Sequence, residues 1–463
     1  MEKTKKFPRP IGFWQMLGPS FVILALGLGS GEVIMWPYLA ANYGLGIAWA
    51  AVLGITFQFF VNMEIERYAL VKGESVFAGL VRMFKWAPWW FIVSTFLGFA
   101  MPGMMAAAAK VFTSWLGWDE FKWVAIVGLL LIGFVLSFGK TVYGMIEKIT
   151  QVVIVLAVPM LFIFVIILAS HADWADLLKG LTGQGNGYRW IPENMDLMIF
   201  LGAFAYAGAG GNLNLTQSIY IREKGYGMGK YAQKIGGLFM GALKQQKVKL
   251  AGEDFAVNKE NLANFREWWK RVNYEHALVF WFIGGVGILL LMILSYATVY
   301  DLGSNDQSIN FVISEAGVIK QILGVNWAGL FMVAVAIMLW QTQLGVLDST
   351  SRIMSENYAL AILDKNEEGK VNMSKIYFTF LWTQIVVGIV LFVLDIKEPK
   401  TLLVVGAVIN AVAMFVHVGM VNWMNWKVLP KETQATIFRK IVIGGIFLFY
   451  GIFATVTLGS KIF

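Results

Sequence analysis

The sequence predicts an all-α protein that crosses a membrane eleven times and contains two repeats of opposite orientation. Of its 463 residues, 58% are hydrophobic and only 14% are charged, and the mean hydropathy is +0.65. No soluble domain needs so much apolar surface. Eleven segments have the length of about 20 apolar residues that a membrane span requires. Two of these segments, the first and the sixth, are interrupted by glycines at matching places.

The eleven segments follow one another with short connections, except after the sixth. Each is long enough to cross a hydrocarbon core of about 30 Å as an α-helix. The predicted spans are 12–42, 45–71, 88–116, 121–141, 145–170, 194–221, 277–299, 326–358, 372–394, 400–427 and 438–460.

Basic residues lie in every second loop and therefore predict the orientation of the spans. They are enriched before the first span and in the loop 222–276, whereas the alternate loops carry acidic residues such as Asp119, Asp173, Asp301 and Asp306. Cytoplasmic loops are enriched in Lys and Arg. We expect a multi-pass protein of a prokaryotic inner or plasma membrane, with a cytoplasmic N-terminus and an external C-terminus. This topology explains the net charge of +8, so no nucleic-acid partner is expected.

The loop 222–276 is the one sizeable soluble segment between the predicted spans. It contains Trp268 and Trp269 among basic residues, which include Lys244, Lys247, Lys249 and Lys270, whereas Lys140 lies in another basic loop, between the fourth and fifth spans. This pattern is typical of an amphipathic helix on the anionic inner leaflet, with membrane lipids as its partners. A regulatory or partner-docking element is the alternative.

The first and sixth spans share an interrupted pattern. When "ALGLGSGEVI" (25–34) is set beside "AYAGAGGNLN" (205–214), Gly31 falls on Gly211 and Glu32 on Asn212. Glycine-interrupted spans at matching positions of two halves indicate the binding site of a transporter.

The matching breaks define two repeats, which we place at residues 1–171 and 194–428, with a further helix at 438–463. Each repeat contains an odd number of spans, so the second repeat must be inverted relative to the first.

Glu32 is the one charged residue at the first break. A carboxylate in mid-membrane costs about 2.5–3.5 kcal/mol on insertion scales. A half-helix that begins here would offset part of this cost through its free amides and its dipole. Glu32 is therefore either a cap that stabilises the break or a ligand for a cation, and we favour the ligand.

The residues that enzymes commonly use are scarce in this chain. It has no cysteine and only three histidines, and it contains no HExxH motif and no Ser/His/Asp arrangement. We therefore expect neither an enzyme nor a bound cofactor. A channel is the competing class, but an inverted repeat with a single central acid favours a carrier.

Three segments resemble the Nramp family of divalent-metal transporters. They are "LGPSFVILALGLGSGEVIMWPYLAANYGLGIAWA" (17–50), "GAGGNLNLTQS" (208–218) and "QLGVLDSTSRIMSE" (343–356), which are similar to that family's helices 1–2, 6 and 8. The resemblance covers essentially the whole chain. It implies the LeuT-like inverted-repeat fold (5+5), in which helices 1 and 6 are broken and access alternates between the two sides.

The binding motifs differ from those of the family. Nramp metal transporters carry Asp-Pro-Gly-Asn in helix 1 and Met-Pro-His in helix 6. Their metal-binding residues are replaced here, and the positions that the two motifs would occupy hold Gly29, Ser30, Gly31, Glu32, Ala209, Gly210 and Gly211. The third span, 88–116, has Met101 and Met104 near the place of the family's acidic residues and contains no Asp or Glu. The chain therefore resembles a divergent, Nramp-related branch, and these changes argue against transition-metal transport.

The altered site offers one carboxylate, one hydroxyl, the amide of Asn212 and backbone carbonyls, but no soft ligand. One negative charge and the loss of large side chains favour a small organic cation, such as a protonated amine, imine or guanidinium, paired with Glu32. A divalent metal ion is the alternative, with hydrated Mg²⁺ before Mn²⁺ or Fe²⁺ because Mg²⁺ keeps several waters. An amino acid is a second alternative, since its carboxylate could bind the amides of the Gly-Ser-Gly turn.

Other polar residues within the spans complete the predicted site. Trp36 lies one turn beyond Glu32 and is either a cation–π partner or an interfacial anchor. Thr216 follows Asn212 by one turn, and we expect Thr216, Gln341 and Asn410 to line the pathway or to join helices.

Coupling and gating are predicted less sharply. Asp348 has Arg352 four residues later, so a local salt bridge is favoured over a role in gating. His417 is a candidate proton carrier. Proton coupling is left open, with Glu32, Asp348 and His417 as the candidates.

Overall fold

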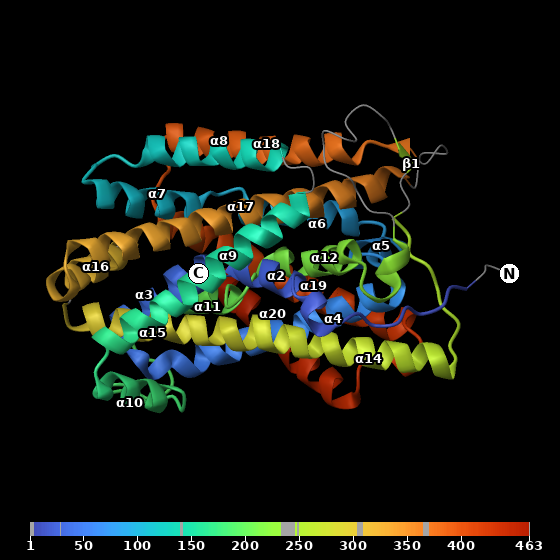
Figure 1. The fold of residues 1–463 in the computed structure, drawn as a ribbon, viewed down its shortest axis with the longest axis horizontal. Helices are drawn as coiled ribbons and strands as arrows, with labels where there is room; N and C mark the ends of the chain where they lie inside the picture. Colours follow the sequence, from blue (N-terminus) through green and yellow to red (C-terminus); the bar gives the residue numbers. More distant parts are fainter. Residues whose placement is uncertain are drawn as a thin grey trace.

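The computed structural model describes residues 4–27, 29–138, 142–232, 246–247, 250–302, 309–363 and 370–462. It is a bundle of helices, most of which run along one long direction (Figure 1). Within these residues, eight helices are long and apolar enough to cross a membrane, or nine if the bent pair Pro19–Gly27 and Gly31–Tyr43 is one span. We call the end that holds the N-terminus, α5 (Val76–Met83) and α14 (Lys259–His276) the basic end.

The first part of the chain contains the first five predicted spans. Its remaining elements are α1 (Phe13–Met16), α2 (Pro19–Gly27), η1 (Ser30–Met35), α3 (Trp36–Tyr43), η2 (Leu45–Ile47), α4 (Ala48–Lys72), α6 (Ala87–Phe99), α7 (Gly103–Leu116), α8 (Lys122–Phe138), α9 (Val142–Leu168) and α10 (His171–Gly180). The third span is divided into α6 and α7, which the prediction missed. Pro102 at this division cannot donate a helical hydrogen bond.

The second part contains the other six predicted spans. Its elements are α11 (Leu197–Ala205), η3 (Gly211–Leu215), α12 (Thr216–Lys224), η4 (Gly227–Tyr231), β1 (Gln246–Lys247), η5 (Ala277–Ile283), α15 (Gly284–Val299), η6 (Tyr300–Leu302), α16 (Asn310–Leu323), α17 (Val325–Leu363), β2 (Lys370–Val371), α18 (Met373–Val393), α19 (Pro399–Val428), η7 (Lys431–Thr433) and α20 (Ile437–Ile462). The strands β1 and β2 pair antiparallel.

Both predicted breaks are present. The helices on either side of the first break are bent by 41°, and the segment after it, η1, is π-helical. At the second break α11 ends at Ala205, and Gly208, Gly210 and Gly211 have φ angles of 117°, 74° and 53°. Glycine adopts these angles without the strain that a Cβ would add. The glycines therefore make the second break possible.

The two breaks touch each other through the backbone. A Cβ at Gly31 would overlap the carbonyl oxygen of Tyr206, the residue that follows α11. Only glycine therefore allows the first broken span to pass this close to the second. We call this contact the crossing.

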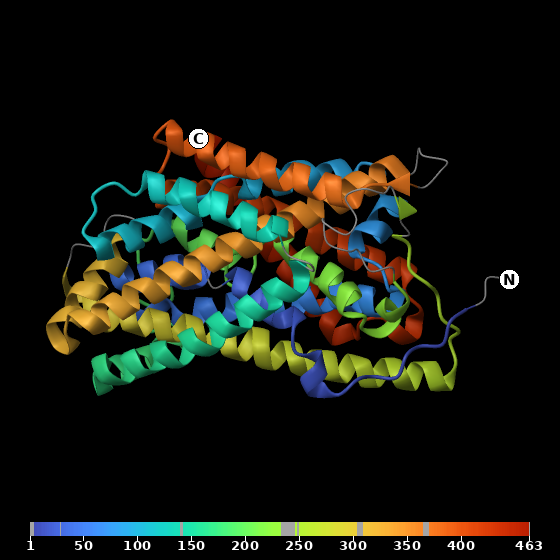
Figure 2. The same ribbon diagram turned by 45° about the horizontal axis from the view of Figure 1, so that its top comes forward.

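The loop 222–276 differs from the expectation. Its helix, α14, continues through η5 into α15, and together they form one helical segment, Lys259–Val299, of 41 residues (Figure 2). Trp268 is buried and its Nε1 donates to the carbonyl of Pro8 at 3.0 Å. The apolar face of α14 is thus covered at Trp268 and Phe265 by the N-terminal segment. Lys140, Lys244, Lys249 and Asp306 lie outside the described residues.

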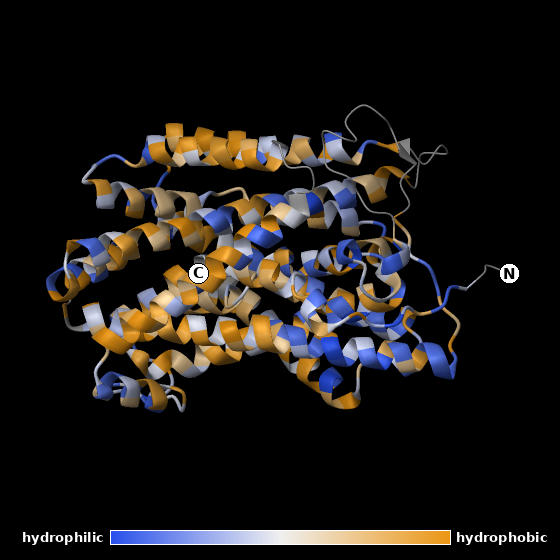
Figure 3. Ribbon diagram, viewed as in Figure 1, coloured by the Kyte–Doolittle hydropathy of each residue, from blue (hydrophilic) through white to orange (hydrophobic). Residues whose placement is uncertain are grey.

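The surface has the polarity of a membrane protein. In Figure 3 apolar residues occupy the middle of the bundle, and hydrophilic residues gather at the basic end. Large apolar side chains on the outer helices are exposed, among them Val127, Leu131, Leu156, Ile163, Val386, Val390, Ile441 and Leu448. Such a surface is stable against lipid and not against water. These observations support an integral, multi-pass membrane protein.

Gly31→Ala tests the crossing. We expect this substitution to lower the free energy of unfolding by about 1–3 kcal/mol or more, because the new methyl group has to displace the Tyr206 carbonyl. The measurement is the thermal unfolding midpoint of the purified protein in detergent. Gly445→Ala on α20 is the matched control, since no atom lies within 4 Å of the added Cβ. Equal midpoints for the two variants would contradict the contact.

Candidate functional site

Glu32 is on η1, beside the crossing, and is fully buried. Neither of its carboxylate oxygens has a hydrogen-bond partner in the described part of the chain. The residue before η1 is Gly29, and no side chain caps this helix. The interpretation of Glu32 as a cap is therefore not supported by a hydrogen bond, and the carboxylate is left available to a ligand.

Three glycines from three elements surround the carboxylate. A Cβ at Gly27 would lie 2.7 Å from Glu32 Oε1 and 2.7 Å from the backbone of Gly208, and a Cβ at Gly284 would lie 3.9 Å from Oε1. We call the surroundings of the Glu32 carboxylate, bounded by Gly27, Gly208 and Gly284, the carboxylate chamber. Glycine at these positions lets the backbones approach the carboxylate, where a Cβ at Gly27 would collide with Glu32 and with Gly208.

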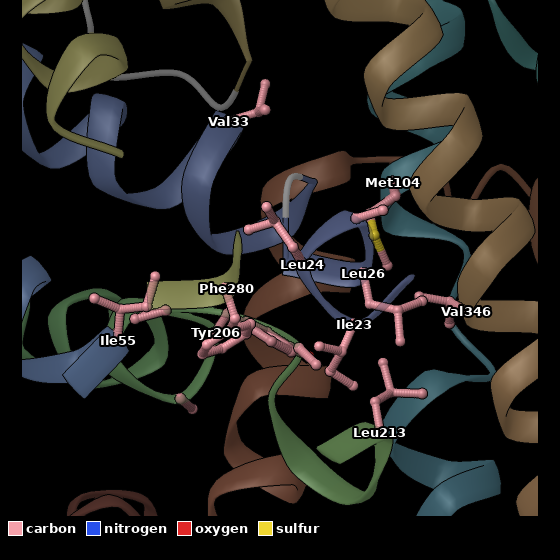
Figure 4. Packing of buried hydrophobic residues seen from close by; sticks show 14 of the residues in the cluster. Ile23, Leu24, Leu26, Val33, Ile55, Met104, Tyr206, Leu213, Phe280 and Val346 are labelled. Carbon is pink, nitrogen blue, oxygen red and sulfur yellow. The ribbon is translucent and has the colours of Figure 1, made fainter. Parts of the chain in front are cut away.

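Apart from Gln58 Oε1, which also faces Gly208, the other side chains that border the carboxylate chamber are apolar. A Cβ at Gly284 would also contact Leu24 and Ile55, and Phe280 lies against Gly208. Figure 4 shows Leu24, Ile55 and Phe280 among the buried apolar side chains, each on a different element. An isolated ionised carboxylate in such surroundings is strongly destabilised. Glu32 must therefore be neutralised by a bound cation or by a proton.

Asn212 is hydrogen-bonded to α6. Its Nδ2 donates to Ser94 Oγ at 2.8 Å and to Thr95 Oγ1 at 2.9 Å, and both of these residues are on α6. No hydrogen bond joins Asn212 to Glu32 among the described residues. Asn212 is held by α6, and the prediction that the two matching residues share one site stays a prediction.

Asn410 holds the second break against α19. Its Nδ2 donates to Tyr206 Oη at 2.8 Å and to the carbonyl of Gly98 at 3.1 Å, and its Oδ1 leaves no room for a Cβ at Gly211. The oxygens Asn410 Oδ1 and Asn212 Oδ1 have no partner within the described ranges. The predicted site is thus divided into the carboxylate chamber and an amide group on the side of α6 and α19.

Gln58 on α4 is a site residue that the sequence reading missed. Its Nε2 donates to the carbonyl of Ala205 at 3.0 Å, and its Oε1 accepts from Gly210 N at 3.1 Å and from Asn214 Nδ2 at 3.2 Å. Gln58 therefore pairs backbone groups that the second break frees. The available signal was the spacing of Gln58, Asn62 and Glu66, which places three polar residues on one face of an apolar span.

Trp36 is fully buried and packs edge-on against Phe200 and Phe204 of α11, with ring centroids 6.2 and 5.9 Å apart. The interpretation of Trp36 as an interfacial anchor is therefore wrong. Its ring forms part of the contact between α3 and α11. The aromatic residue beside the carboxylate chamber is Phe280.

The remaining pathway candidates lie on other faces of the crossing. Thr216 Oγ1 donates to the carbonyl of Leu213 at 2.5 Å and so serves the local turn. Gln341 is buried on α17 with both side-chain polar atoms unpartnered in the described structure. Gly29 packs against Thr342, whose Oγ1 donates to the carbonyl of Ala25 at 2.9 Å. The side chain of Ser30 lies outside the described residues.

Asp348 forms the predicted salt bridge. Arg352 Nε lies 2.7 Å from Asp348 Oδ2, Tyr377 Oη donates to Oδ1 at 2.7 Å, and Arg352 also binds Glu223 of α12 at 2.7 Å. This group ties α12 to α17 at the basic end. His417 is buried on α19, about 10 Å beyond Asn410 along the helix.

The described residues contain no group of three His, Asp or Glu side chains that could hold a metal ion. Around the crossing, Ala209, Gly210 and Gly211 contribute backbone groups only. A cation here would meet one carboxylate, carbonyl and amide oxygens, and an aromatic ring.

Comparison with known proteins identifies the fold. No family model matches the sequence, and no curated protein matches it. A solved structure of a manganese transporter from Eremococcus coleocola matches with a TM-score of 0.70 and 13% identity over 99% of this chain and 90% of that chain. MhsT in complex with L-phenylalanine matches with a TM-score of 0.51 and 11% identity over 95% and 98%. The predicted LeuT-like fold is confirmed, and both of these neighbours are transporters.

Gln58→Met tests the support of the second break. We expect a loss of about 1–3 kcal/mol in the free energy of unfolding, because the amide of Gly210 and the carbonyl of Ala205 would be buried without a partner. The measurement is the unfolding midpoint in detergent. Gln321→Met, at an exposed position on α16, is the matched control. A Gln58→Met midpoint equal to that of the control would show that Gln58 does not stabilise the break.

Proposed function

We propose that this protein is a secondary transporter that carries a small cation across the membrane by alternating access, with Glu32 as the counter-charge. One observation carries the proposal: a fully buried carboxylate, unpartnered within the described chain, lies where two broken spans cross. Intramembrane acids of this kind mark ion and substrate pathways. The fold shared with two transporters supports the same reading.

The mechanism follows from what each broken span contributes. The half-helix α2 ends at Gly27, η1 begins beyond Gly29, and Glu32 lies on η1. The two halves of the span therefore meet the substrate at the same point. When the cation binds, it neutralises Glu32 and lowers the cost of burying the carboxylate. Movement of one half relative to the other would then open the carboxylate chamber to one side or the other.

We favour a small organic cation as the substrate. A single carboxylate matches a single positive charge, and the described residues around the chamber supply no sulfur or imidazole ligand. The apolar residues Leu24 and Ile55 suit the carbon atoms of an amine or a guanidinium, and the ring of Phe280 can face its positive charge. The N–H groups would donate to the two free oxygens of Glu32.

A hydrated divalent cation is the second candidate, and the likeness to a manganese transporter favours it. Mg²⁺ is the first choice, because it keeps several waters and binds through one or two carboxylates. This reading would make the chain an Nramp-related transporter with an altered site. An amino acid is disfavoured, because Glu32 would repel its carboxylate.

Glu32→Gln tests the proposal. We expect at least a tenfold loss of uptake into proteoliposomes, measured with radiolabelled methylammonium and guanidinium and, separately, with Mg²⁺ and a fluorescent indicator. Glutamine keeps the size of the side chain and removes its charge. Glu260→Gln on the exposed face of α14 is the matched control and should transport normally.

The same assay separates the substrate classes. For the organic cation we expect uptake that Mg²⁺ and Mn²⁺ do not inhibit. Calorimetric binding of Mg²⁺ that disappears in Glu32→Gln would select the hydrated ion. Normal uptake of every probe by Glu32→Gln would remove Glu32 from the mechanism.

A further inference from the structure

A second group of buried titratable residues lies nearer the basic end. His276 Nδ1 is 3.1 Å from Glu66 Oε1 and 2.8 Å from Ser20 Oγ, and Ser20 Oγ also donates to Glu275 in a short hydrogen bond. We call Ser20, Glu66, Glu275 and His276 the inner cluster. All four side chains are at least 98% buried. Glu66 Oε2 and His276 Nε2 have no hydrogen-bond partner in the described part of the protein.

The carboxylates of the inner cluster have no Lys or Arg at ion-pair distance among the described residues. The cations that face the cluster are already paired: Arg439 binds Glu64 at 3.0 Å, as does Arg67 at 2.8 Å, and Lys224 binds Glu147 at 2.6 Å. The remaining neighbours are neutral, namely Tyr226 and Gln217, whose Nε2 donates to Glu66 Oε1 at 2.7 Å.

The charges of the inner cluster and of the ion pairs beside it do not balance. Glu64, Glu147, Glu66 and Glu275 are four carboxylates, and Arg67, Arg439 and Lys224 are three cations, so one negative charge remains when His276 is neutral. One proton shared within the cluster would balance this charge. Two carboxylates beside one imidazole titrate together, so the proton belongs to the cluster and not to one residue.

The surroundings favour a proton over a metal ion. The imidazole of His276 is stacked between Phe280 and Phe59, with ring centroids 4.7 and 5.6 Å away. The described residues offer no metal-binding group here. Phenyl rings on both faces exclude water and leave the in-plane nitrogens as the positions where a proton can be held.

The inner cluster joins one half of each broken span to the helices α4 and α14. Ser20 is on α2 and Gln217 on α12, the basic-end halves of the two broken spans, while Glu66 is on α4 and Glu275 and His276 are at the end of α14. The helix α2 runs from Ser20 to Gly27 in the carboxylate chamber, over about 10 Å. A second set of contacts connects the inner cluster with the carboxylate chamber, because Phe280 stacks on His276 and lies against Gly208.

We propose that the inner cluster is a proton-binding site separate from Glu32, and that its proton holds α2 and α12 against α4 and α14. Loss of the proton leaves two carboxylates that repel each other, and α2 and α12 are released at the basic end. The role of this proton as the coupling ion rests on the proposed transport function. The binding of the proton and the movement of α2 do not depend on the proposed transport function.

A distance measurement tests the proposal without any substrate. Because the chain has no cysteine, spin labels can be placed by Trp14→Cys beside α2 and Ile437→Cys on α20, both at exposed positions. We expect the distribution of distances between the labels, measured in lipid nanodiscs, to shift between about pH 5 and about pH 9, a range that brackets the ordinary pKa of histidine. Glu66→Gln with Glu275→Gln should abolish this shift.

Controls separate this proposal from the proposed function. The labelled Glu32→Gln variant should keep the pH-dependent shift even though it has lost uptake. If the double variant does not fold, Glu275→Gln alone serves, because glutamine can still accept the hydrogen bond of Ser20. Distances that are the same at both pH values in the parent protein, or a shift that persists in the glutamine variants, would overturn the proposal.

Proton binding has a direct readout of its own. With only three histidines in the chain, the ¹⁵N resonances of His276 can be assigned by comparison with His276→Gln. We expect them to titrate between the same pH values and to lose this titration in Glu66→Gln with Glu275→Gln. A pH-independent His276 signal in the parent protein would contradict the shared proton.

Discussion

The contact between Gly31 and the carbonyl of Tyr206 is the constraint on which the rest of the structure depends. It brings two interrupted spans together through their backbones, which requires a residue without a side chain. This close approach places Glu32 beside Gly208 and Gly27, and it directs the second break toward α6 and α19. A bulkier residue at 31 would separate the spans and dismantle the carboxylate chamber. The crossing therefore requires glycine at this contact, and the crossing in turn places Glu32 in a buried position.

Breaking two helices within a membrane leaves backbone groups that must find other partners. The structure supplies them from intact neighbouring helices: Gln58 pairs with Ala205 and Gly210, and Thr342 pairs with the carbonyl of Ala25. Asn410 holds the second break through the side-chain hydroxyl of Tyr206. These residues fix the irregular segments, while the oxygens of Glu32 are left without a partner among the described residues. The contrast between satisfied backbone groups and an unsatisfied carboxylate distinguishes the supports from the proposed binding residue.

The sequence predicted which segments lie inside the bundle, but it did not predict which neighbours their side chains contact. Apolar length predicted membrane-spanning helices, of which the described residues contain eight, or nine with the bent pair, and glycine spacing predicted both breaks and the position of Glu32 within the bundle. The equivalence of Glu32 and Asn212 could not show that Asn212 is hydrogen-bonded to Ser94 and Thr95 of α6. The sequence could not show either that Trp36 packs against Phe200 and Phe204 of α11, which bury it. The helix α14 was placed on the leaflet because composition cannot show that the N-terminal segment covers Trp268.

The structure contains two buried acid sites about one α2 length apart. We propose that a cation binds to Glu32 in the carboxylate chamber and that a proton binds to the inner cluster. The most direct measurement is an electron cryo-microscopy map of the protein saturated with the cation that binds in calorimetry. The account predicts new density within about 3 Å of the Glu32 oxygens, between Gly27, Gly208 and Gly284. Density elsewhere, with Glu32 in contact only with protein, would contradict it.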